Sequence, residues 1–211
     1  MRRLLLVLVM LTGASLCSGA GHAARLELSE ADRAALDGVS RYLNTILTLK
    51  GSFIQIGPSG DVDQGSFYIS KPGKMRFVYD RPSPVLIVVD GHTVAVANTR
   101  LNTVDRYPLS QTPLGIVLGD HIDLTKDRDV VGVYHQRGSI VINLRIRGTF
   151  TRTNITLVFS EPEYELRQWS VIDNQGLTTT VALRDVLPGV ELASSLFQLP
   201  EKNSLARHSP D

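Results

Sequence analysis

The stretch SIVINLRIR, at residues 139–147, alternates between two kinds of side chain. A period of two is that of a β-strand, whose successive side chains point to opposite faces of the sheet. One face of this stretch is entirely aliphatic and consists of Ile140, Ile142, Leu144 and Ile146. The other face is mostly polar and holds Val141, Asn143, Arg145 and Arg147. One buried face and one wet face are typical of an antiparallel sheet that is covered on one side.

Similar runs occupy most of residues 52–200, and turn signals separate them. The clearest turn sequences are GPSGD at 57–61, Asp90-Gly91 and DNQG at 173–176. About ten short strands joined in this way predict a mainly β (α+β) fold, built on an antiparallel sheet or barrel.

Two stretches in this part of the chain do not alternate. Residues 99–113 are polar, and we expect them to be irregular. Residues 114–118 (LGIVL) follow Pro113 and predict a short helix with proline at its first turn. The segment 196–200 (LFQLP) is expected to close the fold.

One helix is predicted before the strands. Ser29 and Asp32 have the spacing of a capping box, and Gly51 is the expected stop of a helix over about residues 30–48. Apolar residues recur within it at spacings of three and four, at Leu36, Val39, Leu43, Ile46 and Leu47. A helix with one apolar stripe needs an apolar surface, so we expect it to lie in the concavity of a curved sheet.

The first residues resemble a secretory signal peptide. Arg2 and Arg3 form a basic start, residues 4–11 (LLLVLVML) are apolar, and small residues precede a cut after Ala23, with a cut after Ala20 as the alternative. The sequence therefore predicts a signal peptide over 1–23, a single domain over 24–200, a flexible tail over 201–211, and export to the periplasm.

Composition excludes several classes of function. The chain has 22 Lys and Arg against 21 Asp and Glu, a formal charge of +1, which gives no electrostatic footprint for nucleic acid. The one cysteine, Cys17, lies in the predicted leader, so the domain has no disulfide. No nucleophile, metal or phosphate motif is present, and the carboxylate–histidine cluster DHID at 120–123 is interpreted as a polar loop. We predict no enzyme activity, no metal and no cofactor.

Several segments, taken in order, resemble the LolA family of periplasmic lipoprotein carriers. They are Phe53-x-Gln55, GSFYISKPGKMRF at 65–77, Tyr79-Asp80-x-Pro82, VVDG at 88–91, Thr112-Pro113-Leu114 and LFQLP at 196–200. The resemblance covers about residues 28–200. It implies an incomplete antiparallel barrel with helices as a lid, over a hydrophobic cavity for the acyl chains of lipoproteins.

The resemblance assigns candidate site residues. The implied acyl-chain contacts are Phe53, Phe67, Ile69, Met75, Phe77, Tyr79, Ile140, Ile142, Leu144 and Leu157. The implied lid residues are Leu36, Val39, Leu43, Ile46, Leu114 and Leu118. For each of these residues, a place in an ordinary closed core is the alternative.

Lys71 is the candidate for a lid latch. Family members commonly carry arginine before this proline, and that arginine is thought to bond to the lid. By alternation Lys71 lies on the same face as Phe67 and Ile69, so its ammonium group is expected to reach lid carbonyls without the planar fork of a guanidinium. A lysine that only extends its amine to water at the rim is the alternative.

The resemblance implies lipoprotein cargo, an inner-membrane ABC transporter that supplies it and an outer-membrane acceptor, with the carrier itself a monomer. A related module that binds glycolipids or phospholipids, or that senses envelope stress, would use the same cavity and stays the alternative.

Overall fold

The structure is a computed structural model that describes residues 27–112, 114–127, 129–147 and 152–201. The predicted signal peptide, Pro113 and all but the first residue of the predicted tail lie outside the described residues. Among the described residues, no helix combines the length and the apolar character needed to cross a membrane.

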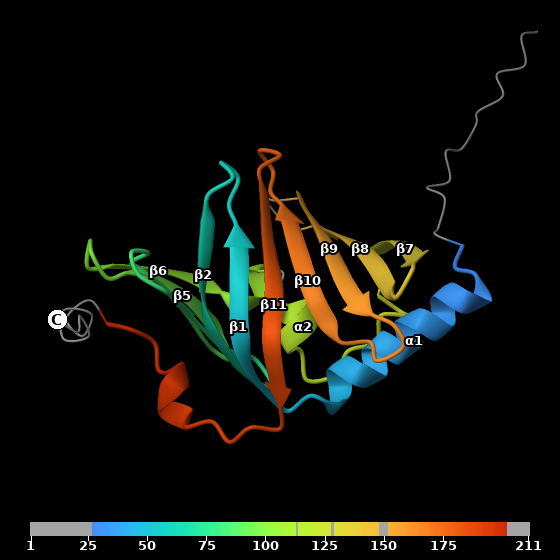
Figure 1. Cartoon of the computed structure of the whole chain (residues 1–211), viewed down its shortest axis with the longest axis horizontal. Helices are drawn as coiled ribbons and strands as arrows, with labels where there is room; N and C mark the ends of the chain where they lie inside the picture. The colour runs from blue at the N-terminus through green and yellow to red at the C-terminus, as the bar shows by residue number, and fades with distance from the viewer. Residues whose placement is uncertain (1–26, 113, 128, 148–151, 202–211) are drawn as a thin grey trace, which may run out of the picture.

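The described strands form one eleven-stranded antiparallel sheet. In chain order they are β1 (Thr48–Ile56), β2 (Val62–Ser70), β3 (Lys74–Tyr79), β4 (Val85–Asp90), β5 (Thr93–Asn98), β6 (Thr103–Pro108), β7 (Val130–Gln136), β8 (Ser139–Arg147), β9 (Arg152–Ser160), β10 (Leu166–Ile172) and β11 (Thr178–Pro188). β1 to β6 form one meander and β7 to β11 a second, and the two join where β1 pairs with β11. The sheet curves strongly but stays open between its edge strands β6 and β7 (Figure 1). The predicted curved antiparallel sheet is confirmed.

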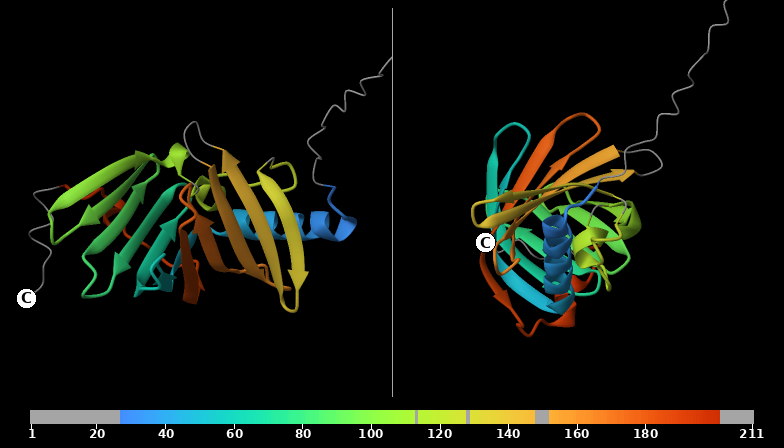
Figure 2. Two further views of the ribbon diagram at one scale, coloured as in Figure 1. Left: turned by 90° about the horizontal axis from the view of Figure 1, so that it is seen from above. Right: turned by 90° about the vertical axis from the view of Figure 1, so that its right-hand side faces the viewer.

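Two α-helices lie on the concave side of this sheet: α1 (Glu30–Thr45) and the single turn α2 (Gly115–Leu118), as Figure 2 shows. The predicted capping box starts α1: the Asp32 N–H donates to Ser29 Oγ at 3.1 Å, and the Ser29 N–H donates to the Asp32 carboxylate at 2.9 Å. α2 belongs to the connection between the two meanders. That connection therefore passes over the concave face.

The predicted end of the first helix was wrong by one turn. α1 ends at Thr45, and Ile46 is already extended. Gly51, the expected stop, lies inside β1, where an added Cβ would come 2.7 Å from the ring of Phe67 and from the Arg184 carbonyl oxygen. Gly51 therefore serves close packing of the sheet and does not end the helix.

The irregular stretch expected at 99–113 contains a strand and a 3₁₀ helix, β6 and Leu109–Gln111. Almost every residue of β6 is exposed, because it lies at the sheet edge and pairs only with β5. Such a strand needs no apolar alternation, and charge on it discourages edge-to-edge association.

The segment expected to close the fold lies against the face of the sheet opposite the helices. It includes part of a 3₁₀ helix, Ser194–Phe197, and buries Phe197. Arg76 of β3 donates to the Leu196 carbonyl oxygen at 3.1 Å, and Arg106 of β6 donates to that of Pro200 at 2.8 Å. The C-terminal segment therefore supports the β3–β6 part of the sheet from outside.

Candidate functional site

The residues predicted to contact acyl chains lie together on the concave face. All of them are buried members of one apolar cluster: Phe53, Phe67, Ile69, Met75, Phe77, Tyr79, Ile140, Ile142, Leu144 and Leu157. They come from β1, β2, β3, β8 and β9, so the curvature of the sheet brings both meanders to one site. Their contact with lipid stays a prediction.

Aromatic side chains of β1 to β3, together with Trp169 of β10, form what we call the floor of the site. Phe77 is central: its ring centroid lies 4.7 Å from that of Phe53, 5.6 Å from that of Phe67 and 6.0 Å from that of Trp169. Tyr79 continues the group and donates its hydroxyl to Gln55 Oε1 at 2.7 Å. Burial raises the pKa of Tyr79 from its ordinary value of 10 to about 12, so this phenol stays neutral well into the alkaline range.

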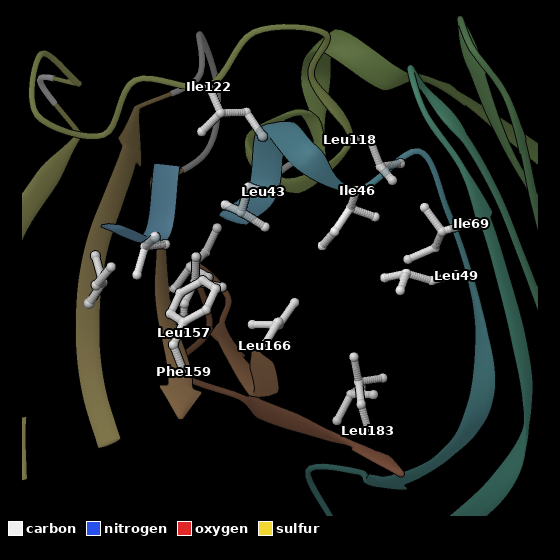
Figure 3. Packing of buried hydrophobic residues seen from close by; sticks show 14 of the residues in the cluster. Leu43, Ile46, Leu49, Ile69, Leu118, Ile122, Leu157, Phe159, Leu166 and Leu183 are labelled. Carbon is white, nitrogen blue, oxygen red and sulfur yellow. The ribbon is translucent and has the colours of Figure 1, made fainter. Parts of the chain in front are cut away.

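The predicted lid residues close over this floor. Of the predicted stripe, Leu36, Val39 and Leu43 of α1 and Ile46 just beyond its end lie within the cluster. Leu118 of α2 is buried beside them, and Leu114 packs at the margin. The prediction was wrong for Leu47, which follows the end of the helix and is exposed. In Figure 3 the side chains of Leu43 and Ile46 point toward Leu166 and the strands, as does that of Leu118.

A small apolar cavity of about 50 Å³ lies between α2 and the sheet. It is lined by Ile69, Met75, Leu114, Val117, Leu118, Ile155, Leu157, Leu166, Trp169 and Val171. For comparison, a cavity of about 150 Å³ holds one benzene molecule. The cavity is therefore too small for an acyl chain, and apolar side chains of the helices occupy much of the space above the sheet.

Sequence reasoning missed several residues of the site. Trp169 and Val171 line the cavity from β10. They alternate with polar residues, so the pattern by which residues 139–147 were recognised as a strand would also have identified them. Ile122 and Leu124 are buried against α1, but they lie in a polar loop without periodicity and gave no signal. The cavity thus extends further under β9 and β10 than predicted.

A tight turn between β2 and β3 touches both helices of the lid. We call residues Lys71–Gly73 the latch turn. Lys71 Nζ donates to the Leu43 carbonyl oxygen of α1 at 2.7 Å, and the Lys71 N–H donates to that of Leu47 at 2.8 Å. The Gly73 N–H donates to the Leu118 carbonyl oxygen of α2 at 2.8 Å.

Lys71 is half-buried at this position. Burial lowers the pKa of its ammonium group, and the carboxylate of Asp120 partly opposes that shift. The lysine therefore points to the concave side, as the alternation predicted, and bonds to the lid. Its role as a latch stays a prediction.

In the cluster at 120–123, the carboxylate of Asp123 is paired within its own loop. Asp123 is bound by Lys126 at 2.8 Å, and hydrogen bonds from Lys126 and Thr125 lower the pKa of Asp123 to about 2. In the part of the chain that the structure describes, no three His, Cys, Asp or Glu side chains are arranged to hold a metal ion.

Comparison with known proteins agrees with the geometry. A family model described as "Outer membrane lipoprotein carrier protein LolA" matches residues 44–200. An outer-membrane lipoprotein carrier protein of Methylibium petroleiphilum is 32% identical over 119 residues, which are 52% of this chain and 55% of that relative. The chain thus spans about half the length of that relative.

Other similarities are longer but weaker. An outer-membrane lipoprotein carrier protein of Methylococcus capsulatus is 25% identical over 179 residues, which are 81% of this chain and 85% of that protein. Among solved structures, a putative outer membrane lipoprotein-sorting protein domain from Vibrio parahaemolyticus has a TM-score of 0.48 at 11% identity, covering 82% of this chain and 98% of that one.

Proposed function

Because the chain belongs to the LolA family of outer membrane lipoprotein carrier proteins, we propose that it binds lipoprotein acyl chains under its lid and carries them through the periplasm. Members of this family are carriers rather than enzymes. The observation that most supports the proposal is the continuous apolar cluster between the two helices and the concave face of the sheet.

The lid offers a physical means of reversible binding. Each acyl CH₂ removed from water contributes about 0.8 kcal/mol, so a few chains in a fully open site would bind too tightly to be passed on. When the stripe of α1 leaves the cluster, each large side chain loses about 1.5–3 kcal/mol of burial. This cost offsets part of the free energy gained from the cargo, so the net affinity stays low enough for the cargo to be released.

We assign Lys71 to the control of this equilibrium. Its ammonium group bonds to α1 where the helix lies over the sheet, and we expect this bond to be lost when the helix moves away. The bond stabilises the empty form, so it favours release of cargo. Arginine would make the same kind of contact with more donors.

The proposed pathway follows from the family. The protein would enter the periplasm with residues 1–23 as its signal peptide, and residues 24–200 would act as one carrier domain. An inner-membrane ABC transporter would load it as a monomer, and the outer membrane, with or without an acceptor lipoprotein, would receive the cargo. Nucleic acid and cofactors have no part in this proposal.

A matched pair of variants tests the site. Leu43 is buried in the stripe of α1, whereas Leu47, four residues later, is 71% exposed. A triacylated lipopeptide added to the purified protein should change the emission of Trp169, which lines the cavity. Leu43→Asp should abolish this response, because it places a charge against the acyl chains, and Leu47→Asp should preserve it.

A second variant and a second ligand complete the test. Val117→Phe fills the existing cavity without a charge and should weaken the response even if Leu43→Asp fails to fold. Circular dichroism checks the fold of each variant. Binding of lipopeptide by folded Leu43→Asp would show that the cavity is assigned wrongly. A response to phospholipid vesicles alone would favour the related lipid carrier.

A further inference from the structure

Two polar side chains of α1 reach across to the connection that contains α2. We call residues 115–127, which comprise α2 and the loop after it, the lid segment. Asn44 Nδ2 donates to the Ile122 carbonyl oxygen at 2.8 Å, and the Ile122 N–H donates back to Asn44 Oδ1 at 2.9 Å. The Asn44 amide therefore satisfies both backbone groups of one residue, as a neighbouring strand would.

Ser40, one helical turn earlier, makes a second link. The Leu124 N–H donates to Ser40 Oγ at 3.0 Å, and Ser40 Oγ donates to the Leu36 carbonyl oxygen at 2.6 Å. Ser40 is itself buried. A buried N–H left without an acceptor is costly, so this link resists separation of the two parts.

Apolar packing joins the same two parts. The side chains of Ile122 and Leu124 are both buried in the cluster that holds the α1 stripe, and Figure 3 shows Ile122 next to Leu43. The lid segment is thus fixed to α1 by bonds from the Asn44 and Ser40 side chains to the main chain of Ile122 and Leu124, and by the packing of the Ile122 and Leu124 side chains.

The bonds between lid and sheet are of another kind. At the latch turn, the acceptors are carbonyl oxygens at or just beyond the C-terminal ends of α1 and α2, namely those of Leu43, Leu47 and Leu118. Carbonyls at a helix end lack an intrahelical partner, and water replaces the lost donor when they are exposed. Breaking these bonds exposes the carbonyl oxygens to water, whereas separating Ser40 from Leu124 would leave a buried N–H without an acceptor.

We propose that Asn44 and Ser40 are positioning residues that fasten α1 and the lid segment into one rigid lid, which opens as a unit when the latch-turn bonds, the contact of Asp32 with His135 and the apolar packing on the sheet are broken. The role of this motion in loading rests on the proposed function, whereas the rigidity is a property of the chain itself. Lys71 bonds to α1 and Gly73 bonds to α2. In this proposal the two helices move together when both bonds break.

Amide hydrogen exchange, followed by NMR on the cargo-free protein, tests this directly. We expect the amides of Ile122 and Leu124 to exchange more slowly than the amide of Gly73, which opens with the latch turn. In Lys71→Met, exchange at Gly73 should rise about tenfold, while exchange at Ile122 and Leu124 stays at the wild-type rate. A parallel rise at all three amides would overturn the proposal.

Asn44→Ala should raise exchange at Ile122 selectively, because it removes the acceptor for that amide. Asn44→Asp, which keeps an acceptor oxygen, should restore protection of Ile122. Thr45→Ala is the matched control, since Thr45 Oγ1 donates only within α1, to the Tyr42 carbonyl oxygen at 2.8 Å, and should leave Ile122 unchanged. Unchanged exchange at Ile122 in Asn44→Ala would also overturn the proposal.

These measurements separate the two proposals. The exchange pattern requires no cargo, so it tests the rigid lid even if the lipopeptide fails to bind. A failure of lipopeptide binding together with the expected exchange pattern would overturn the proposed function alone.

Discussion

Gly65 shows how a single residue shapes the floor of the site. It lies in β2 opposite Tyr79, and a Cβ at this position would overlap the Val78 carbonyl oxygen and come 2.9 Å from the ring of Phe53. Only glycine lets the backbone of β3 and the aromatic ring approach so closely. The aromatic floor therefore depends on the absence of a side chain here.

Gly65→Ala should destabilise the fold by about 1–3 kcal/mol, because backbone and ring must both shift to make room. Urea unfolding gives the change in the free energy of unfolding. Gly115→Ala serves as the control, since a Cβ there meets no atom within 4 Å. Equal stability of the two variants would show that the packing at Gly65 is looser than described.

The proposed latch role of Lys71 belongs to the same scale and concerns function. A hydrogen bond from a charged group contributes about 1.5–3 kcal/mol, and 1.4 kcal/mol corresponds to a tenfold change in affinity. Because Lys71 is only half-buried, we expect the lower end of that range. Lys71→Met should thus bind lipopeptide about tenfold more tightly and release it more slowly, with little change in folding.

Stopped-flow emission of Trp169 during transfer to acceptor vesicles measures this release. Lys71→Arg keeps a charged donor and should behave like the wild type. Unchanged transfer kinetics in Lys71→Met would remove Lys71 from the mechanism.

At the scale of elements, the start of α1 combines capping with charge. A hydrogen bond from Ser29 is the main cause that lowers the pKa of Asp32, and His135 of β7 adds to it at 3.1 Å. A carboxyl whose folded pKa is depressed stabilises the protein above its usual value of 3.8 and loses that contribution as the pH falls through the lower folded pKa. This end of the lid is therefore sensitive to acid.

Ser29→Ala should lower the free energy of unfolding by about 1 kcal/mol near neutral pH, which is the usual effect of losing an N-cap side chain. Its loss of stability on acidification below 3.8 should be smaller than that of the wild type. Urea unfolding at several pH values checks both statements, with Thr45→Ala as the control, since Thr45 Oγ1 donates to the Tyr42 carbonyl oxygen and to no carboxylate. The same acid dependence in Ser29→Ala and wild type would contradict the assignment.

The elements also show what sequence predicts and what it does not. Burial of one face leaves a periodic pattern in the sequence. A period of two predicted the strands within 139–147 and 65–79, and spacings of three and four predicted the stripe of α1. β6 was not predicted, because an edge strand exposed on nearly all its residues leaves no periodic trace. The end of α1 was misjudged because Gly51 serves ring packing.

The candidate site was predictable to a similar extent. The floor, the lid stripe and the direction of Lys71 followed from alternation and from the family resemblance. The links from Asn44 and Ser40 to residues 122 and 124 did not, because they join a helix to an irregular loop far along the chain. Such contacts depend on how the connection crosses the concave face.

For the whole molecule, the topology and the proposed function fit together. Two meanders joined at β1 and β11 make a trough. The connection between β6 and β7 crosses this trough and, together with α1, forms the proposed lid. Opening the lid therefore leaves the paired strands intact. The sheet supplies an apolar wall, and the proposed lid contacts it mainly through apolar side chains.

The central claim is that this protein carries lipoproteins to the outer membrane. Depleting it in the bacterium that encodes it, followed by separation of the two membranes and quantification of lipoproteins in each, tests that claim most directly. Outer-membrane lipoproteins should accumulate in the inner membrane, and expression of wild-type protein but not of Leu43→Asp should restore their distribution. Normal sorting after depletion would contradict the claim.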